Sequence, residues 1–286
     1  MRHSSFLFIT LSSVLALAGC EDPRESEVDR AFEAVNAIDD TNLSSVMLNT
    51  TNPGDAVAYF QRASAQKPDR IDLKRGLAIS LVRNKQITAS VPVWTEVVAH
   101  PEATPDDSLG LADALIRQGD WDRAEEVLNG VPPTFETFKR YRLEAMIADS
   151  NQQWKKADSF YEVAVGLTTQ PANVLNNWGY SKLNRGDYRA AERMFQEALT
   201  YDPNLFTAKN NIALARGAQR NYTLPVVRMT QIERAQMLHT LGLAAVKQGD
   251  IETAKGLLKD AVESHPQHFE AAVRALRALE GGVVAG

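Results

Sequence analysis

Residues 172–203 read ANVLNNWGYSKLNRGDYRAAERMFQEALTYDP, and the pattern of this stretch decides the fold. Two segments with apolar residues at helical spacing flank a turn at Gly186. Gly179 in the first segment and Ala191 in the second fall where two antiparallel helices cross, because only small side chains let helix backbones approach closely. Pro203 ends the second segment, since proline cannot continue a helix. The stretch therefore predicts one antiparallel pair of helices.

The spacing of this helix pair recurs along the chain. From Ala235 onward, Gly242, Ala254 and Pro266 fall at the equivalent positions. Weaker copies begin near residues 37, 71, 105, 138 and 206. The starts from 37 to 206 are separated by 33 or 34 residues, whereas the copy at 206 has only 29. So regular a period predicts a repeat protein in which each unit is one helix pair that packs on its neighbours.

Particular residue types are expected to hold each unit together. Those at helix crossings or helix stops include Gly179, Ala191, Phe195, Pro203, Gly242, Ala254 and Pro266. Glycine followed by aspartate should end the first helix and cap the second in three units, at Gly119-Asp120, Gly186-Asp187 and Gly249-Asp250. A large residue in place of Gly179 or Ala191 would overpack the crossing, at a cost of about 1 to 3 kcal/mol.

This combination of residues and spacing resembles the tetratricopeptide repeat. The resemblance implies an all-α fold, a right-handed superhelix (α-solenoid) of about six or seven antiparallel helix pairs over residues 37–266. Residues 267–286 would follow as an amphipathic capping helix and a short tail. In the unit at 206, Tyr222 to Pro225 interrupt the second helix, so we expect a degenerate repeat whose shortened second helix kinks the superhelix locally.

The N-terminus has the layout of a signal peptide over residues 1–19. A basic Arg2 precedes an apolar stretch, residues 6–17, that is too short to span a membrane, and small residues lead to Cys20. The sequence Leu-Ala-Gly-Cys ending at Cys20 resembles the lipobox of bacterial lipoproteins. That resemblance implies cleavage between Gly19 and Cys20 and acylation of the cysteine, which anchors the chain permanently. A signal-anchor helix with an incidental cysteine is the alternative.

The residues after the cysteine bear on location. Residues 20–36 are charged, contain Pro23 and lack an apolar run, which is typical of a short tether. By resemblance to lipoprotein sorting, aspartate directly after the cysteine favours retention in the inner membrane, whereas glutamate, present here as Glu21 before Asp22, is a weaker retention signal. We therefore expect the outer membrane, facing the periplasm, rather than the inner membrane. The covalent acyl lipid on Cys20 is the only attached group expected, with no cofactor and no metal.

Composition and motifs exclude several functions. The chain has 286 residues, 44% of them hydrophobic and 23% charged, which excludes a disordered or polytopic membrane protein. Its net charge of −5 is dispersed, so neither nucleic acid nor a polybasic membrane contact is expected. Catalytic motifs and a small-molecule substrate site are not evident, and one cysteine cannot build a disulfide or a cysteine-ligated zinc site. His265 and His268 are better explained by a solvated turn than by a metal site.

Function is therefore expected to lie in binding. In tetratricopeptide repeats, positions 2, 5, 9, 12 and 13 face the concave groove. Carried onto this chain, those positions give the candidate peptide groove Arg75, Arg142, Asn176, Tyr180, Asn210 and His239, with Arg83, Arg117 and Lys247 in addition. This mixed polar set suits a peptide backbone or a terminal carboxylate, although each residue taken alone is better explained as solvated surface. The lysine and asparagine pair that binds chaperone tails is missing from every unit.

The whole-chain layout resembles the TadD family of tight-adherence (Flp) pilus lipoproteins. The resemblance rests on the lipidated cysteine, the tether, the repeats, and local runs such as Asn176 to Tyr180. It implies a non-catalytic, periplasm-facing scaffold that binds protein partners and assembles or localises the pilus secretion machinery, with the secretin as partner. A type IV pilus pilotin, or an adaptor for cell-wall hydrolases or for outer-membrane protein assembly, is the alternative.

Overall fold

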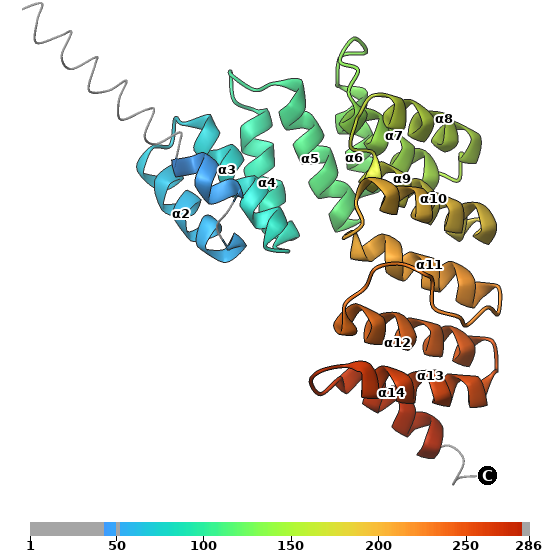
Figure 1. The fold of residues 1–286 in the computed structure, drawn as a ribbon. Helices are drawn as coiled ribbons and strands as arrows, with labels where there is room; N and C mark the ends of the chain where they lie inside the picture. The colour runs from blue at the N-terminus through green and yellow to red at the C-terminus, as the bar shows by residue number, and fades with distance from the viewer. Residues whose placement is uncertain (1–42, 50–51, 282–286) are drawn as a thin grey trace, which may run out of the picture.

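The computed structural model describes residues 43–49 and 52–281, and every regular element in these ranges is a helix (Figure 1). Residues 43–49 are helical. The helices that follow are α2 (Pro53–Gln66), α3 (Ile71–Arg83), α4 (Ile87–Val98), α5 (Pro105–Gln118), α6 (Trp121–Asn129), α7 (Phe138–Ser150), α8 (Trp154–Gly166), α9 (Ala172–Asn184), α10 (Tyr188–Tyr201), α11 (Phe206–Ala218), α12 (Gln231–Lys247), α13 (Ile251–Ser264) and α14 (Glu270–Gly281). The expected all-α solenoid is confirmed. The expected signal peptide, Gly19, Cys20, the tether and the first repeat start at 37 lie outside the described residues.

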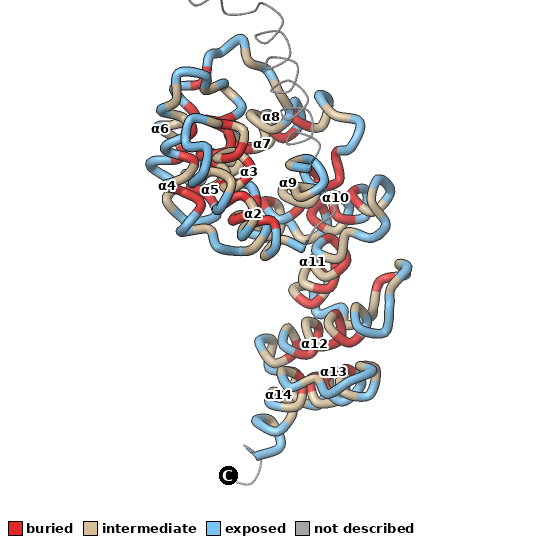
Figure 2. The backbone as a smooth tube through the Cα atoms, turned by 90° about the vertical axis from the view of Figure 1, so that its left-hand side faces the viewer, coloured by how far each residue is buried: buried red, intermediate tan, exposed pale blue. Residues whose placement is uncertain are grey.

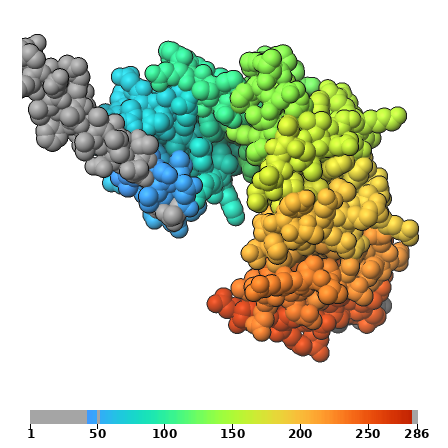
Figure 3. Space-filling view, turned by 45° about the horizontal axis from the view of Figure 1, so that its top comes forward, coloured from blue at the N-terminus to red at the C-terminus, as the bar shows by residue number. Residues whose placement is uncertain are grey.

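The helices form two layers. The first helices of the repeats (A helices) are α3, α5, α7, α9, α11 and α12, and the second helices (B helices) are α2, α4, α6, α8, α10 and α13. Each A helix packs on the B helix before it or after it, and the stack curves from α2 to α14 (Figures 1 and 3). Successive A helices from α3 to α12 contact one another, whereas B helices in the described residues share no comparable contact. The A helices therefore form the concave wall.

Small residues allow the helix pairs to close. At Gly179 in α9, an added Cβ would lie 2.6 Å from the ring of Phe195 in α10. At Gly242 in α12, it would lie 2.9 Å from Leu258 in α13. Phe195 and Leu258 are fully buried, and burial runs along the inside of the stack (Figure 2). The fully buried Ala191 and Ala254 also lie on the B helices of these pairs.

The turn between the helices of a repeat has one recurring backbone conformation. Its key residue is left-handed in every repeat from α3 to α13, whether glycine (Gly119, Gly186, Gly249) or a larger residue (Lys85, Gln152, Arg220). Where glycine is present, the aspartate after it caps the B helix as expected. Asp120, Asp187 and Asp250 each accept a hydrogen bond from the backbone N–H three residues on, at 3.4, 3.2 and 3.3 Å. Helices α10 and α13 end just before Pro203 and Pro266.

The sixth repeat lacks its second helix, so the expectation of a shortened helix is wrong. No residue between Ala218 and Gln231 is helical. Pro225 has no N–H to donate and disfavours helical geometry at the residue before it. The Asn221 side chain accepts bonds from the Thr223 backbone N–H and hydroxyl, at 3.1 and 2.7 Å, which fixes a turn instead. A non-helical segment, residues 219–230, takes the place of the helix.

Apolar side chains of this segment pack against the neighbouring helices. Leu224, Val227 and Met229 pack on a buried cluster formed by α11 and α12. Val226, by contrast, is fully exposed. Helix α12 then begins at Gln231, four residues before the expected repeat start at 235, because Thr230 and Glu233 form a capping box.

Candidate functional site

Polar side chains on the concave wall connect neighbouring A helices. Two candidate groove residues in the N-terminal half, Arg75 and Arg142, take part in these contacts. Both Arg75 and Arg142 form ion pairs with an aspartate of the preceding or following A helix. Arg75 holds Asp107 with two bonds of 2.7 Å, and Arg142 holds Asp113 at 2.9 Å. Asp113 also accepts a bond of 2.6 Å from Arg117. Arg75 and Arg142 therefore connect neighbouring repeats, and each is already paired with a carboxylate.

The pKa values of the two aspartates agree with this pairing. Burial alone raises the pKa of Asp113, but the charges of Arg142 and Arg117 outweigh burial and hold the pKa below its ordinary value. The same balance, with Arg75 and the Thr104 cap opposing burial, lowers the pKa of Asp107. Both acids thus remain ionised partners of the arginines at neutral pH.

The C-terminal candidates also meet the neighbouring A helix. Asn211 donates to Asn176 at 3.1 Å, and Thr240 donates to Asn210 at 2.7 Å. The ring of His239 lies 5.3 Å from that of Phe269, just before the capping helix α14. Burial lowers the pKa of His239 more than its hydrogen bond with the Ala271 backbone raises it.

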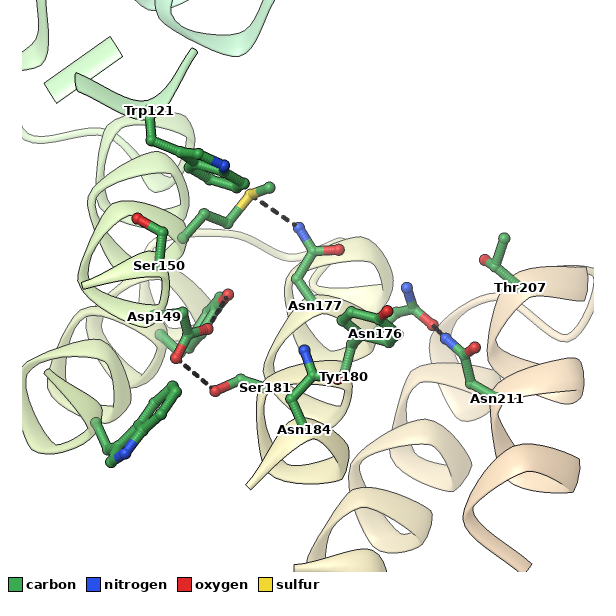
Figure 4. A pocket seen from close by; sticks show the side chains of 13 residues that line it. Trp121, Asp149, Ser150, Asn176, Asn177, Tyr180, Ser181, Asn184, Thr207 and Asn211 are labelled. Atoms are coloured by element: carbon green, nitrogen blue, oxygen red, sulfur yellow. Dashed lines mark hydrogen bonds between the residues drawn. The ribbon is translucent and has the colours of Figure 1, made fainter. Parts of the chain in front are cut away.

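Two cavities on the concave wall form one groove. The first cavity, of about 380 Å³, lies between α7, α8, α9 and α11, with Trp121 of α6 at its edge (Figure 4). The second, of about 570 Å³, lies between α9, α11 and α12. Asn184 lines both cavities, so they adjoin one another at this residue. We call this combined depression the concave groove.

The structure divides the six candidates between this groove and its surroundings. Asn176 and Tyr180 line the first cavity, and Asn210 lines the second. Arg75, Arg142 and His239 line neither cavity. Among the additional candidates, Lys247 lines the second cavity.

Aromatic and amide side chains dominate the first cavity. The aromatic residues are Trp121, Trp154, Tyr161 and Tyr180, and the amides are Asn176, Asn177, Asn184 and Asn211. Tyr180 is 49% exposed, so much of its ring is free to contact a ligand. Asparagine offers both donors and acceptors, which is the combination that an extended peptide backbone requires. Leu214, Leu243 and Ala244 give the second cavity an apolar part beside polar residues such as Thr240 and Lys247.

One acid lies at the wall of the first cavity. Asp149 of α7 accepts a bond of 2.6 Å from the Ser181 hydroxyl of α9 and one of 3.0 Å from the Tyr161 hydroxyl of α8 (Figure 4). Burial raises the pKa of Asp149 above its ordinary value, since these bonds and the nearby Arg185 offset burial only in part.

A second acid fixes the cavity wall from behind. Asp158 of α8 accepts two bonds from Arg185, at 2.7 and 3.0 Å, and one each from Lys182 and the Trp178 indole, at 2.9 and 2.6 Å. Burial raises the pKa of Asp158, but these bonds outweigh burial and hold the pKa well below its ordinary value. Arg185 also lies over the Trp154 ring, 5.4 Å from its centroid. The cluster holds α8 and α9 in register and orients Trp154.

Several residues of the concave groove were not among the sequence candidates, although they occupy repeat positions that are expected to face the groove. Met146, Asp149 and Ser150 occupy positions 9, 12 and 13 of their repeat, and Asn184 occupies position 13 of the next. The first residue of the B helix was a further signal. Trp121 and Trp154 begin α6 and α8 and reach the concave groove from there.

The described residues contain neither a membrane-spanning helix nor a metal-binding cluster. In residues 43–49 and 52–281, no helix combines the length and the apolar character needed to cross a membrane. The same residues contain no group of three or more histidine, cysteine, aspartate or glutamate side chains that could hold a metal ion.

The helix pairs and their concave groove define a superhelical repeat protein of the interaction-scaffold class. The sequence matches the tetratricopeptide repeat model over residues 75–134, 176–224 and 239–282, together more than half of the chain. The chain belongs to the tetratricopeptide repeat family. Proteins with these repeats bind protein partners, and the fold is generally a non-catalytic scaffold.

Solved structures agree with this fold at low sequence identity. A tetratricopeptide repeat protein from Parabacteroides merdae is 14% identical, with a TM-score of 0.55 over 84% of this chain and 96% of that one. The human IFIT1 dimer with m7Gppp-AAAA is 15% identical, with a TM-score of 0.62 over 82% of this chain and 61% of that one.

A third similar structure is the APC/C hetero-tetramer Cut9-Hcn1. Its matched chain is 13% identical, with a TM-score of 0.59 over 82% of this chain. The present chain spans only 48% of the length of that one. These similarities establish the fold alone. No curated protein matches the sequence.

Proposed function

We propose that this protein is a lipid-anchored, non-catalytic scaffold that holds an extended segment of a protein partner in its concave groove. The observation that carries the proposal is the adjacency of the two cavities, which follow one another across α7, α9, α11 and α12 and meet at Asn184. A groove that crosses successive A helices suits an extended chain, because such a chain presents contacts at regular intervals along its length. Exposed Tyr180 and Leu243 would contact its side chains, while the asparagines would bind its backbone.

The site of action we propose is the periplasmic face of the outer membrane, and the partner is the secretin of a tight-adherence (Flp) pilus machine. The lipobox-like sequence ending at Cys20 supports the anchor, and the charged stretch of residues 20–36 supports a tether between lipid and repeats. The resemblance of the whole-chain layout to the TadD family supports the machine. Escort of a secretin requires binding and placement, and no bond needs to be made or broken.

The groove is tested by two matched tyrosines. Tyr180 lines the concave groove and is 49% exposed, whereas Tyr201, 48% exposed at the end of α10, lines neither groove cavity. Because both side chains are half in solvent, replacement by alanine should leave the fold intact in each case. We expect Tyr180→Ala to weaken copurification of the secretin about tenfold, the effect of removing one aromatic anchor, and Tyr201→Ala to leave it unchanged. Equal behaviour of the two variants would exclude the groove as the binding site.

The cellular role is tested by deletion. A strain without this protein should contain fewer outer-membrane secretin multimers and fewer Flp pili. Normal multimers and normal pili in that strain would refute the proposed role.

The anchor is tested by Cys20→Ser. The variant should fold but move from the membrane fraction to the soluble fraction, because it cannot receive the acyl chains. If the variant stays with the membranes, the lipid anchor is refuted.

A further inference from the structure

The first cavity of the concave groove contains a single charged side chain. Its thirteen lining residues are otherwise aromatic, amide, hydroxyl or thioether side chains, and the exception is Asp149. A ligand that enters this space therefore meets one carboxylate in largely apolar surroundings, where the interaction between charges is stronger than in water.

The Asp149 carboxylate has acceptor capacity left over. Its Oδ1 accepts one bond from Ser181 and its Oδ2 accepts one from Tyr161, and both donors are neutral hydroxyls. A carboxylate has about four lone-pair positions, so about half of them stay available. Among the described residues, no arginine, lysine or histidine forms an ion pair with Asp149.

The cations near Asp149 form their ion pairs with other acids. Arg185 and Lys182 both bind Asp158, at 2.7 and 2.9 Å. Arg142, on the same helix as Asp149, binds Asp113 at 2.9 Å. The raised pKa of Asp149 agrees with this pattern, because its burial is incompletely compensated within the chain. A cation supplied from outside would complete the pairing.

Aromatic faces surround the same space. Trp121 is 36% exposed and Tyr180 is 49% exposed, and both line the cavity together with Trp154 (Figure 4). Aromatic faces attract cations, and they also contact the methylene stem of a long basic side chain. Arg185 over Trp154 shows that this wall already accepts a guanidinium from its own chain.

We propose that the first cavity binds a lysine or arginine side chain of the partner segment, with Asp149 pairing the charge and Trp121 and Tyr180 flanking the stem. The inference rests on the proposed function, because it names the partner chemistry at the same groove. The second cavity, which is lined by Leu214, Leu243 and Ala244, would hold an apolar side chain of that segment. The segment would therefore carry a basic residue followed or preceded by an apolar one.

The experiment uses the full chain in detergent with fluorotryptophan in place of its four tryptophans. The probes are N-acetyl-lysine methylamide, N-acetyl-arginine methylamide and the neutral norleucine analogue. Signals of Trp121 and Trp154 report on the cavity, while the buried Trp94 serves as an internal reference. We expect the two cationic probes to shift the cavity signals and to bind about tenfold more tightly than the norleucine probe.

Two variants identify the carboxylate as the cause. Asp149→Asn keeps the shape and can still pair with Ser181 and Tyr161, so we expect it to fold and to lose the preference for cations. Glu197→Gln, an exposed acid on α10, should keep the preference. Should Asp149→Asn not fold, Trp121→Ala should weaken binding of the cationic probes. Equal binding of lysine and norleucine probes by the wild type, or an unchanged preference in Asp149→Asn or unchanged binding in Trp121→Ala, would overturn the inference.

Failure of this inference is separable from failure of the proposed function. Peptides tiled along the secretin are compared with versions in which glutamine replaces each lysine and arginine. Peptides that bind equally well in both versions would refute the basic side chain while the groove function stands. Shifts with the lysine probe but no binding by any secretin peptide would support the basic site and refute the secretin as partner.

Discussion

Replacing Gly179 by alanine tests whether the close crossing of α9 and α10 holds this repeat together. The added Cβ would lie 2.6 and 2.8 Å from two ring carbons of Phe195 and 3.1 Å from the Met194 Cβ. Ordinary carbon contacts lie at about 3.5 to 4.0 Å, so the ring would have to move by about 1 Å. Phe195 is fully buried in a cluster with Leu175, Ala198 and Ile212, so the ring can shift only by displacing these neighbours. The substitution therefore overpacks the crossing.

The expected size follows from two opposing terms. Overpacking of a core costs about 1 to 3 kcal/mol, and exchange of glycine for alanine inside a helix returns about 1 kcal/mol. We therefore expect Gly179→Ala to lower the free energy of unfolding by about 1 kcal/mol. The control is Gly256→Ala in α13, where an added Cβ meets nothing within 4 Å. That variant should gain about 1 kcal/mol, which makes the difference between the two about 2 kcal/mol.

The assay is urea unfolding followed by far-ultraviolet circular dichroism, with both the midpoint and the slope compared. Replacing Phe195 by the smaller leucine, the residue type that faces Gly242 in the last repeat, should relieve the overlap. Gly179→Ala should then cost less in the Phe195→Leu background than in the wild type. If Gly179→Ala stabilises the protein as much as Gly256→Ala does, the reasoning about the crossing is refuted.

Three further predictions concern the turns and the titrating groups. Lys85 is left-handed, with φ of 60°, so Lys85→Gly should stabilise the fold by about 0.5 to 1 kcal/mol in urea unfolding, whereas Asn84→Gly, at φ −82°, should destabilise it. Because the folded-state pKa of Asp158 is depressed, the stabilisation from its ionised form is present above about pH 4 and lost below that pH. The difference in unfolding free energy between wild type and Asp158→Asn should therefore become smaller as the pH falls below about 4. A difference that stays constant would contradict this prediction. The pKa of His239 is also depressed below its ordinary value of about 6.5, so protonation as the pH falls below that value should reduce amide-exchange protection in α14, and His239→Gln should abolish this pH dependence.

Local spacing was sufficient to predict most of the helices. Helices α3, α5, α7, α9 and α11 begin at Ile71, Pro105, Phe138, Ala172 and Phe206, since small residues, turn glycines and prolines act within one repeat. The same information overestimated the sixth repeat. Pro225 signalled an interruption, but whether a short helix survives depends on Leu224, Val227 and Met229 packing on α12, a later helix.

The groove was less accessible to sequence reasoning than the helices. A register position shows that a side chain faces the concave wall, but not whether that side chain is already bound to another residue of the protein. Arg75 and Arg142 form ion pairs with Asp107 and Asp113 of neighbouring A helices, whereas the side chain of Tyr180 is half exposed to solvent. Asp149 belongs to the cavity because Trp121 and Trp154 begin B helices beside it, which is a juxtaposition of three helices and not a local pattern.

The missing second helix of the sixth repeat has a consequence for unfolding. In a linear array, cooperativity passes from unit to unit through the interfaces between them. Elsewhere a B helix lies between one A helix and the next, but at the sixth repeat α11 packs directly on α12, and residues 219–230 pack on the cluster that these two helices share. Coupling between the N-terminal array and the block of α12, α13 and α14 therefore depends on side chains of α11, α12 and residues 219–230, with no B helix to carry it. The second cavity of the groove lies across this interface, so a ligand bound there would contact both parts of the array.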